Sequence, residues 1–180
     1  MAGAQKKVIV RLFDGETANP PAPVAGYLPA SGIAEAGNVA LMDPGGRVIS
    51  FALRDIKWIA YVRDFNTGDA LEPERLGRKT FPARPRSEGL WLRMSFRDGD
   101  ALEGLAGLDI TFLDSIVADG GLMVTPPDAR SNTQRMYVPR SALAGLELLG
   151  LVTSAAKRKA ATKPGREPQP WLFEIGRAHV

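Results

Sequence analysis

The chain has 180 residues, 44% of them hydrophobic and 24% charged, a composition typical of one globular domain or two very small ones. It contains no cysteine and one histidine, so disulfides, thiolate nucleophiles and cysteine-ligated metals are excluded. The net charge is +3, but six of the 23 basic residues and two of the 20 acidic ones follow Val152. The preceding part is therefore nearly neutral, and the charge alone does not indicate nucleic-acid binding.

One strand-and-turn pattern occurs twice. Residues 8–16 align with residues 92–100, and in both runs alternate positions are apolar. This period of two predicts half-buried strands. Both runs then reach an Asp-Gly pair, Asp14-Gly15 and Asp98-Gly99, which predicts equivalent hairpin turns, and a further glycine follows in each, Gly26 and Gly104.

The rest of each unit continues as short strands. They are predicted at residues 39–42, 47–53, 57–62, 121–125, 135–139 and 146–152. The run Asp43-Pro44-Gly45-Gly46 predicts a type II turn with positive φ at Gly45. Neither unit contains a clear amphipathic helix, so each has about five strands and the fold class is all-β.

Two tandem five-stranded barrels of the SH3 or Sm type are predicted, because closing a small sheet removes its exposed edges. The alternative is one sandwich built from both halves. The barrels are placed at residues 5–65 and 90–152, joined by a Pro/Arg-rich linker at 66–89. Residues 153–180 are predicted to be a disordered basic tail.

The last seven residues, 174–180, resemble the translation of a sequencing adapter. They contain His179, and we therefore place no chemistry on this residue.

The tandem order over residues 6–152 resembles an uncharacterised bacterial family of unknown function. The resemblance rests on Val62-Arg63-Asp64-Phe65, on residues 96–100 with Glu103-Gly104, and on residues 127–132 followed by Arg135. It implies small β-barrel units of the kind found in bacterial signalling proteins, sometimes near PilZ modules. It implies no activity.

The densest polar cluster is predicted in a turn after residue 125. Its members are Asp128, Arg130, Ser131, Asn132 and Arg135. Such a loop could present a guanidinium and amides to a phosphate or to a partner's backbone. The alternative, which we favour, is that Asp and Asn satisfy the turn's own backbone while an arginine pairs with Asp128.

The linker carries a basic run close to aromatic residues. The basic residues are Arg78, Lys79, Arg84 and Arg86, and the aromatic ones are Phe81 and Trp91. This combination suits single-stranded nucleic acid. The arginine spacing Arg75-x-x-Arg78 differs from the R-x-x-x-R of PilZ domains that bind cyclic dinucleotides. A solvated linker is the alternative that we favour.

No catalytic, nucleotide-binding or calcium-binding motif is present in the sequence. We therefore expect no enzyme activity, no cofactor and no metal, and the absence of a long apolar run predicts a cytoplasmic protein without membrane insertion. The expected function is a non-enzymatic interaction or regulatory adaptor for an unidentified protein partner. The alternative is a nucleic-acid or nucleotide binder that uses the linker arginines. A stripe of Arg78, Arg84, Arg93 and Arg97 on one face would favour this alternative, and arginines paired with carboxylates would favour the adaptor.

Overall fold

The structure is a computed structural model, and it describes residues 5–13, 22–29, 37–66, 68, 71–109, 120–128 and 130–153. The Asp14-Gly15 turn and nearly all of the predicted tail lie outside these residues. Among the described residues, no helix is long and apolar enough to cross a membrane.

The described chain is all-β, as predicted, and its strands fall into two runs of five. The N-terminal unit consists of β1 (Lys6–Leu12), β2 (Val24–Leu28), β3 (Asn38–Met42), β4 (Val48–Ala52) and β5 (Ile56–Val62). The C-terminal unit consists of β6 (Gly89–Phe96), β7 (Ala101–Ala106), β8 (Gly121–Thr125), β9 (Thr133–Pro139) and β10 (Leu143–Val152). One 3₁₀ turn precedes the last strand of each unit, η1 (Leu53–Asp55) and η2 (Arg140–Ala142).

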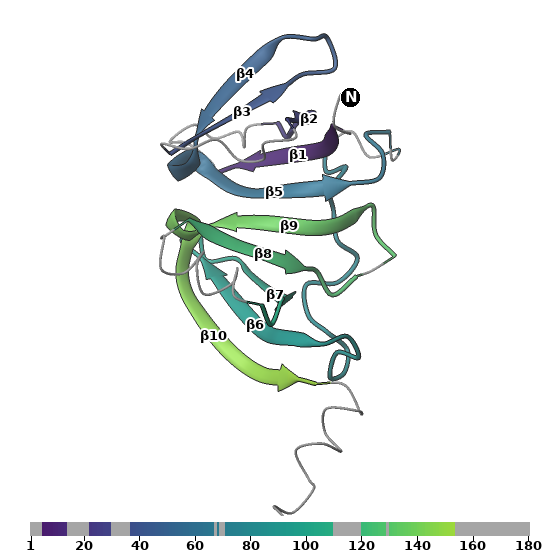
Figure 1. The fold of residues 1–180 in the computed structure, drawn as a ribbon, viewed down its shortest axis with the longest axis vertical. Coiled ribbons are helices and arrows are strands. Elements are labelled where there is room, and N and C mark those ends of the chain that lie inside the picture. Colours follow the sequence, from purple (N-terminus) through teal and green to yellow (C-terminus); the bar gives the residue numbers. More distant parts are fainter. Residues whose placement is uncertain are drawn as a thin grey trace, which may run out of the picture.

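All ten strands form one antiparallel sheet in the order β10-β6-β7-β8-β9-β5-β1-β2-β3-β4 (Figure 1). The prediction of two closed barrels therefore needs correction, because no strand pair among the described residues closes either unit. Instead β5 of the N-terminal unit pairs with β9 of the C-terminal unit. This joint pairs the backbone N–H and C=O groups of one edge strand from each unit. Without it, each unit would have to close into a barrel to pair them.

The two units have the same strand order and the same register. Three residues in each unit meet at equivalent points of the ladders: Val8, Gly26 and Tyr61 in the first, and Leu92, Gly104 and Leu148 in the second. Gly26 and Gly104 fill the same role, because the next strand passes too close to either residue to leave room for a side chain. A Cβ on Gly26 would lie 2.9 Å from the Met42 carbonyl oxygen, and one on Gly104 would lie 2.9 Å from the Val124 Cβ. The repeat predicted from the sequence is thus present in the pairing.

Two hairpins use one turn type. The N–H of Gly99 donates to the Phe96 carbonyl (3.0 Å), and φ is +86° at Gly99, which confirms a turn at Asp98-Gly99. In the β3–β4 hairpin the N–H of Gly46 donates to the Asp43 carbonyl, also at 3.0 Å. Positive φ falls on Gly46 (+83°) and not on Gly45, so the predicted type II turn is wrong. In both hairpins glycine follows a tight turn and takes the left-handed conformation.

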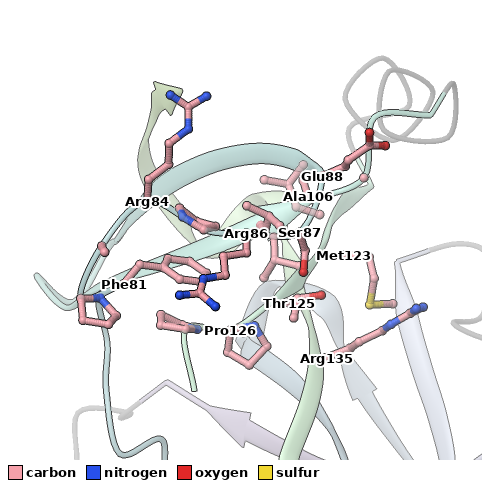
Figure 2. Close-up of a pocket in the computed structure, with 18 of the residues that line it drawn as sticks. Phe81, Arg84, Arg86, Ser87, Glu88, Ala106, Met123, Thr125, Pro126 and Arg135 are labelled. Carbon is pink, nitrogen blue, oxygen red and sulfur yellow. The ribbon is translucent and has the colours of Figure 1, made fainter. Parts of the chain in front are cut away.

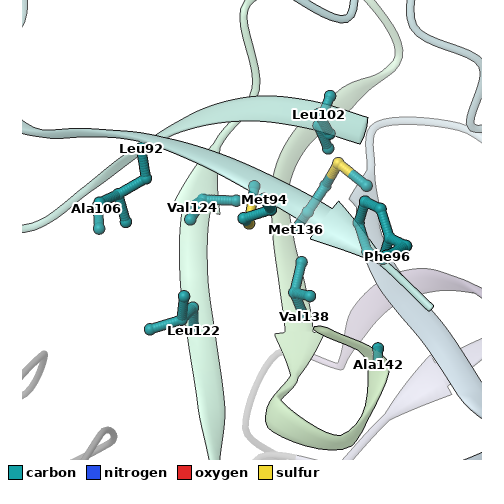
Figure 3. Packing of buried hydrophobic residues seen from close by; sticks show 10 residues of the cluster. All are labelled: Leu92, Met94, Phe96, Leu102, Ala106, Leu122, Val124, Met136, Val138 and Ala142. Atoms are coloured by element: carbon teal, nitrogen blue, oxygen red, sulfur yellow. The ribbon is translucent and has the colours of Figure 1, made fainter. Parts of the chain in front are cut away.

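Each unit packs its own hydrophobic cluster. The N-terminal cluster consists of Val8, Val10, Leu28, Val39, Leu41, Ile56 and Ile59. The C-terminal cluster, shown in Figure 3, consists of Leu92, Met94, Phe96, Leu102, Ala106, Leu122, Val124, Met136, Val138 and Ala142. Phe96 also meets Trp58 of β5 edge to face, with ring centroids 5.4 Å apart. This contact links the C-terminal core to the N-terminal unit.

Candidate functional site

The polar loop before β9 binds the linker. The Asp128 carboxylate accepts hydrogen bonds from the N–H of Gly77 (3.0 Å) and of Arg130 (3.1 Å). The Ser131 hydroxyl donates to the Asp128 carbonyl at 2.8 Å. The guanidinium of Arg130 is exposed, and no arginine forms an ion pair with Asp128 among the described residues. Asp128 and Ser131 therefore stabilise the loop and its contact with the linker.

Asn132 connects three segments. Its Nδ2 donates to the carbonyls of Asp64 (2.7 Å) and Pro73 (3.0 Å), and its Oδ1 accepts the N–H of Asp64 (2.9 Å). The next residue, Thr133, donates its hydroxyl to the Glu74 carbonyl at 3.0 Å. These bonds hold the start of the linker against β9.

The basic residues of the linker and of β6 differ in their partners. Lys79 Nζ lies 2.6 Å from Asp100 Oδ1, and Arg84 donates to the Leu151 carbonyl at 2.6 Å. Arg93 pairs with two carboxylates, and Arg97 donates to the Arg54 carbonyl. Arg78 is exposed. Among the described residues, only Arg93 of these four arginines pairs with carboxylates, so neither an open basic stripe nor a set of carboxylate-paired arginines is present.

A buried carboxylate organises the middle of the linker. Glu103 is 4% exposed and accepts hydrogen bonds from the Phe81 N–H (2.9 Å), Trp91 Nε1 (3.0 Å) and Arg93 Nη2 (3.1 Å). Burial raises the pKa of Glu103, but these donors outweigh burial and hold the pKa below its ordinary value. This role of Glu103 is not predictable from the sequence, because local sequence does not show which strand the linker covers.

A second ionic cluster lies where the two units meet. The buried Lys57 of β5 reaches Asp98 (2.6 Å) and Asp100 (3.1 Å) in the β6–β7 turn, and Lys79 reaches Asp100 from the linker. Burial raises the pKa of Asp100, while hydrogen bonds from Lys79 and Lys57 hold it below its ordinary value. The Asp-Gly turn thus also holds the two units together.

The structure brings together three predicted site residues that are distant in sequence. Arg84 and Arg86 of the linker and Arg135 of β9 all line a groove of about 690 Å³. Its walls are linker residues 81–88 on one side and strands β7 and β8 on the other. We call this the linker groove. It does not include Arg78, Lys79, Asp128, Arg130, Ser131 or Asn132, so the two predicted clusters contribute only part of their residues.

Figure 2 shows how the three arginines differ. The Arg84 side chain turns away from Arg86, whereas Arg86 lies near Pro126 and Arg135 lies beside Met123. Within the described residues, the guanidinium groups of Arg86 and Arg135 make no hydrogen bond or ion pair. Both are therefore available to an anionic group in the groove.

The other lining residues make the linker groove mixed in character. Apolar surface comes from Pro82, Pro85, Pro126, Leu105 and Met123. The carboxylates of Glu88 and Asp109 also line it. Phe81 is held by Trp91 in an edge-to-face contact with centroids 6.2 Å apart. No group of three or more potential metal-ligating His, Cys, Asp or Glu side chains occurs within the residues that the structure describes.

Comparisons with known proteins place the chain in a family without assigning it an activity. No curated protein and no solved structure matches it. The model of a family of unknown function, DUF6982, matches residues 4–150, and the chain therefore belongs to that family.

Proposed function

We propose that this protein is a non-enzymatic interaction module that binds an extended acidic segment of a partner protein in the linker groove. The observation that carries the proposal is that Arg86 and Arg135, which have no hydrogen bond or ion pair within the described part of the chain, both line one partly apolar groove. Guanidinium groups bind carboxylates through paired hydrogen bonds, and the proline-rich walls offer rigid apolar contact to the intervening side chains.

The same arginines could bind a phosphate, so nucleic acid or a nucleotide is the second candidate. One observation favours a peptide. The ring of Phe81 already packs edge to face with Trp91, which leaves it poorly placed as a stacking platform for bases.

The test starts from a display library of twelve-residue peptides selected on the full chain. An Arg86→Ala/Arg135→Ala double variant serves for counter-selection. We expect the selected peptides to be enriched in Asp and Glu. Their affinity, measured by fluorescence anisotropy at about 0.15 M salt, should fall tenfold or more for either single variant. Arg78→Ala is the matched control, because it removes an exposed linker arginine outside the groove, and it should change affinity less than about twofold.

Single-stranded RNA, single-stranded DNA and cyclic dinucleotides are titrated under the same conditions. Micromolar or tighter nucleotide binding that is lost in the same groove variants would replace the peptide proposal with the nucleotide one. Selected peptides without acidic enrichment, or peptide binding that survives loss of both arginines, would overturn the proposed use of the groove.

A further inference from the structure

The sheet ends in two different strands. β4 and β10 are the outermost strands, and each has one neighbouring strand among those described. They lie at opposite ends of the molecule (Figure 1). β4 is the fourth strand of the N-terminal unit, and β10 is the fifth strand of the C-terminal unit.

The joint between the units already pairs these two kinds of strand. It sets the fifth strand of one unit, β5, against the fourth strand of the other, β9. We propose that copies of this chain assemble head to tail, with β10 of one copy pairing antiparallel with β4 of the next in the register that joins β5 to β9. This inference is independent of the linker groove, because it uses other strands.

The ladders fix which residues would pair. In the joint, Ile59, Ala60 and Tyr61 face Tyr137, Met136 and Arg135. On the β10 side, residues 146–148 take the places of residues 59–61 in β5. The reason is that β10 pairs with β6 as β5 pairs with β1: Leu146 faces Met94 as Ile59 faces Val10, and Leu148 faces Leu92 as Tyr61 faces Val8. Glu147 lies between them, at the place of Ala60. On the β4 side, Ile49 pairs with Leu41 as Met136 pairs with Val124. The expected pairs between copies are Leu146–Ser50, Glu147–Ile49 and Leu148–Val48.

The side chains at these positions fit this pairing. Leu148 is 61% exposed and Val48 is 75% exposed, and the register places them opposite each other. Leu146 is 43% exposed, while Ile59 at the equivalent point of the joint is fully buried. Natural sheet edges are usually protected by charges, prolines or bulges, and exposed apolar side chains on an edge favour strand addition. Pairing between copies would give Leu146 the cover that Ile59 has in the joint, and it would bring the apolar side chains of Leu148 and Val48 into contact.

A second copy is the occupant that the repeat supports, because both halves of the contact lie in this chain and one such contact already exists within it. The contact is heterologous, so assembly continues until a ring closes or a filament forms. The end of β10 is engaged by the linker, since Arg84 donates to the Leu151 carbonyl. The proposed pairing therefore involves the part of β10 that precedes Leu151.

Cross-linking distinguishes this contact from a symmetric one. The chain has no cysteine, so Val48→Cys and Leu148→Cys introduce single thiols. Directly opposed residues in antiparallel strands have Cα atoms about 4.5–5.5 Å apart, which suits a disulfide. Under a mild oxidant we expect neither single variant to cross-link with itself, a mixture of the two to give a linked dimer, and the Val48→Cys/Leu148→Cys chain to give a ladder of oligomers. Cross-linking of a single variant with itself, or none in the mixture, would refute the head-to-tail register.

Charged variants test the same contact without oxidation. Sedimentation of the full chain across a concentration series should show either a closed ring or oligomers that grow beyond a dimer. Val48→Lys or Leu148→Glu alone should weaken it tenfold or more, and the two together should restore it, because Lys of one copy then faces Glu of the next. Leu71→Glu is the matched control: Leu71 is 77% exposed but lies in the linker, so association should be unchanged. A monomer at every concentration, or equal effects of Leu71→Glu and Leu148→Glu, would overturn the proposal.

Discussion

The two units share a register but differ in the chemistry of their outer face. At one equivalent point of the ladders, the N-terminal unit places Ile9, Ala25 and Ala60 side by side, and the C-terminal unit places Arg93, Glu103 and Glu147. The first three belong to an apolar cluster that Phe65 and Trp58 cover. In the second trio, Arg93 lies 3.1 Å from Glu103 and 3.2 Å from Glu147.

The covering segment explains this difference. The linker crosses the C-terminal unit and presents the Phe81 N–H to Glu103. A covered backbone N–H needs an acceptor, and an apolar trio would provide none. The inner face, by contrast, is apolar in both units, with Val8, Val10 and Leu41 matched by Leu92, Met94 and Val124. The inner face therefore maintains the fold, while the outer face adapts to what packs on it.

The largest expected effect comes from the inner face. Phe96→Ala should lower the free energy of unfolding by about 3–5 kcal/mol, because it empties a buried aromatic site and removes the contact with Trp58. Leu12 takes the equivalent place in β1 but is only partly buried, so Leu12→Ala should cost about 1–2 kcal/mol. Urea unfolding followed by circular dichroism measures both. Equal costs would show that the two cores are not as different at this point as the burial indicates.

The second-largest effect on stability is expected in the ionic trio formed by Arg93, Glu103 and Glu147. Glu103→Ala should cost about 2–3 kcal/mol, because it leaves the Phe81 N–H and the Trp91 Nε1 without their acceptor. An Arg93→Ile/Glu103→Ala variant, which approaches the N-terminal pattern, should not recover this loss, because those two donors are still unpaired. Full recovery would indicate that the carboxylate serves Arg93 alone.

The same carboxylate makes stability depend on pH. Because the folded pKa of Glu103 lies below its ordinary value of 4.5, its contribution is fully present above pH 4.5 and is lost as pH falls through the folded pKa. The difference in unfolding free energy between the wild type and Glu103→Gln should therefore shrink as pH is lowered from 7 to 3. A constant difference over this range would show that ionisation of Glu103 does not contribute.

The all-β class, the Asp98-Gly99 turn and the repeat were predictable because each depends on local pattern. Alternation of apolar residues identifies an inner face, and Asp-Gly identifies a turn. The joint between β5 and β9 was not predictable, because any two edge strands can pair and local sequence does not choose between them. The roles of Lys57 and Glu103 depend on the same long-range arrangement. Likewise, Arg86 and Arg135 stand in separate parts of the sequence, and only the fold places them in one groove.

A smaller effect is expected at the hairpin turns. Gly99 has φ +86°, a conformation that β-branched residues resist, so Gly99→Val should cost more than about 1 kcal/mol. Open space surrounds the position where a Cβ would stand, so the cost arises from the backbone and not from a clash. If Gly15 occupies the equivalent turn of the N-terminal unit, Gly15→Val should cost a similar amount. A cost for Gly99→Val without a similar cost for Gly15→Val would contradict the predicted equivalence of the two turns, and unchanged urea midpoints for both variants would contradict the cost assigned to positive φ.

The smallest expected effect distinguishes the two carboxylates of the ionic trio. Glu147 and Arg93 are 62% and 44% exposed, so their ion pair is screened by water and costs side-chain entropy to maintain. Glu147→Ala should change the free energy of unfolding by less than about 0.5 kcal/mol, and added salt should reduce that change further. The measurement uses dilute protein, so that any association through β10 does not contribute. A cost approaching that of Glu103→Ala would mean that Arg93 needs both carboxylates to hold its position, and the trio would then act as one unit.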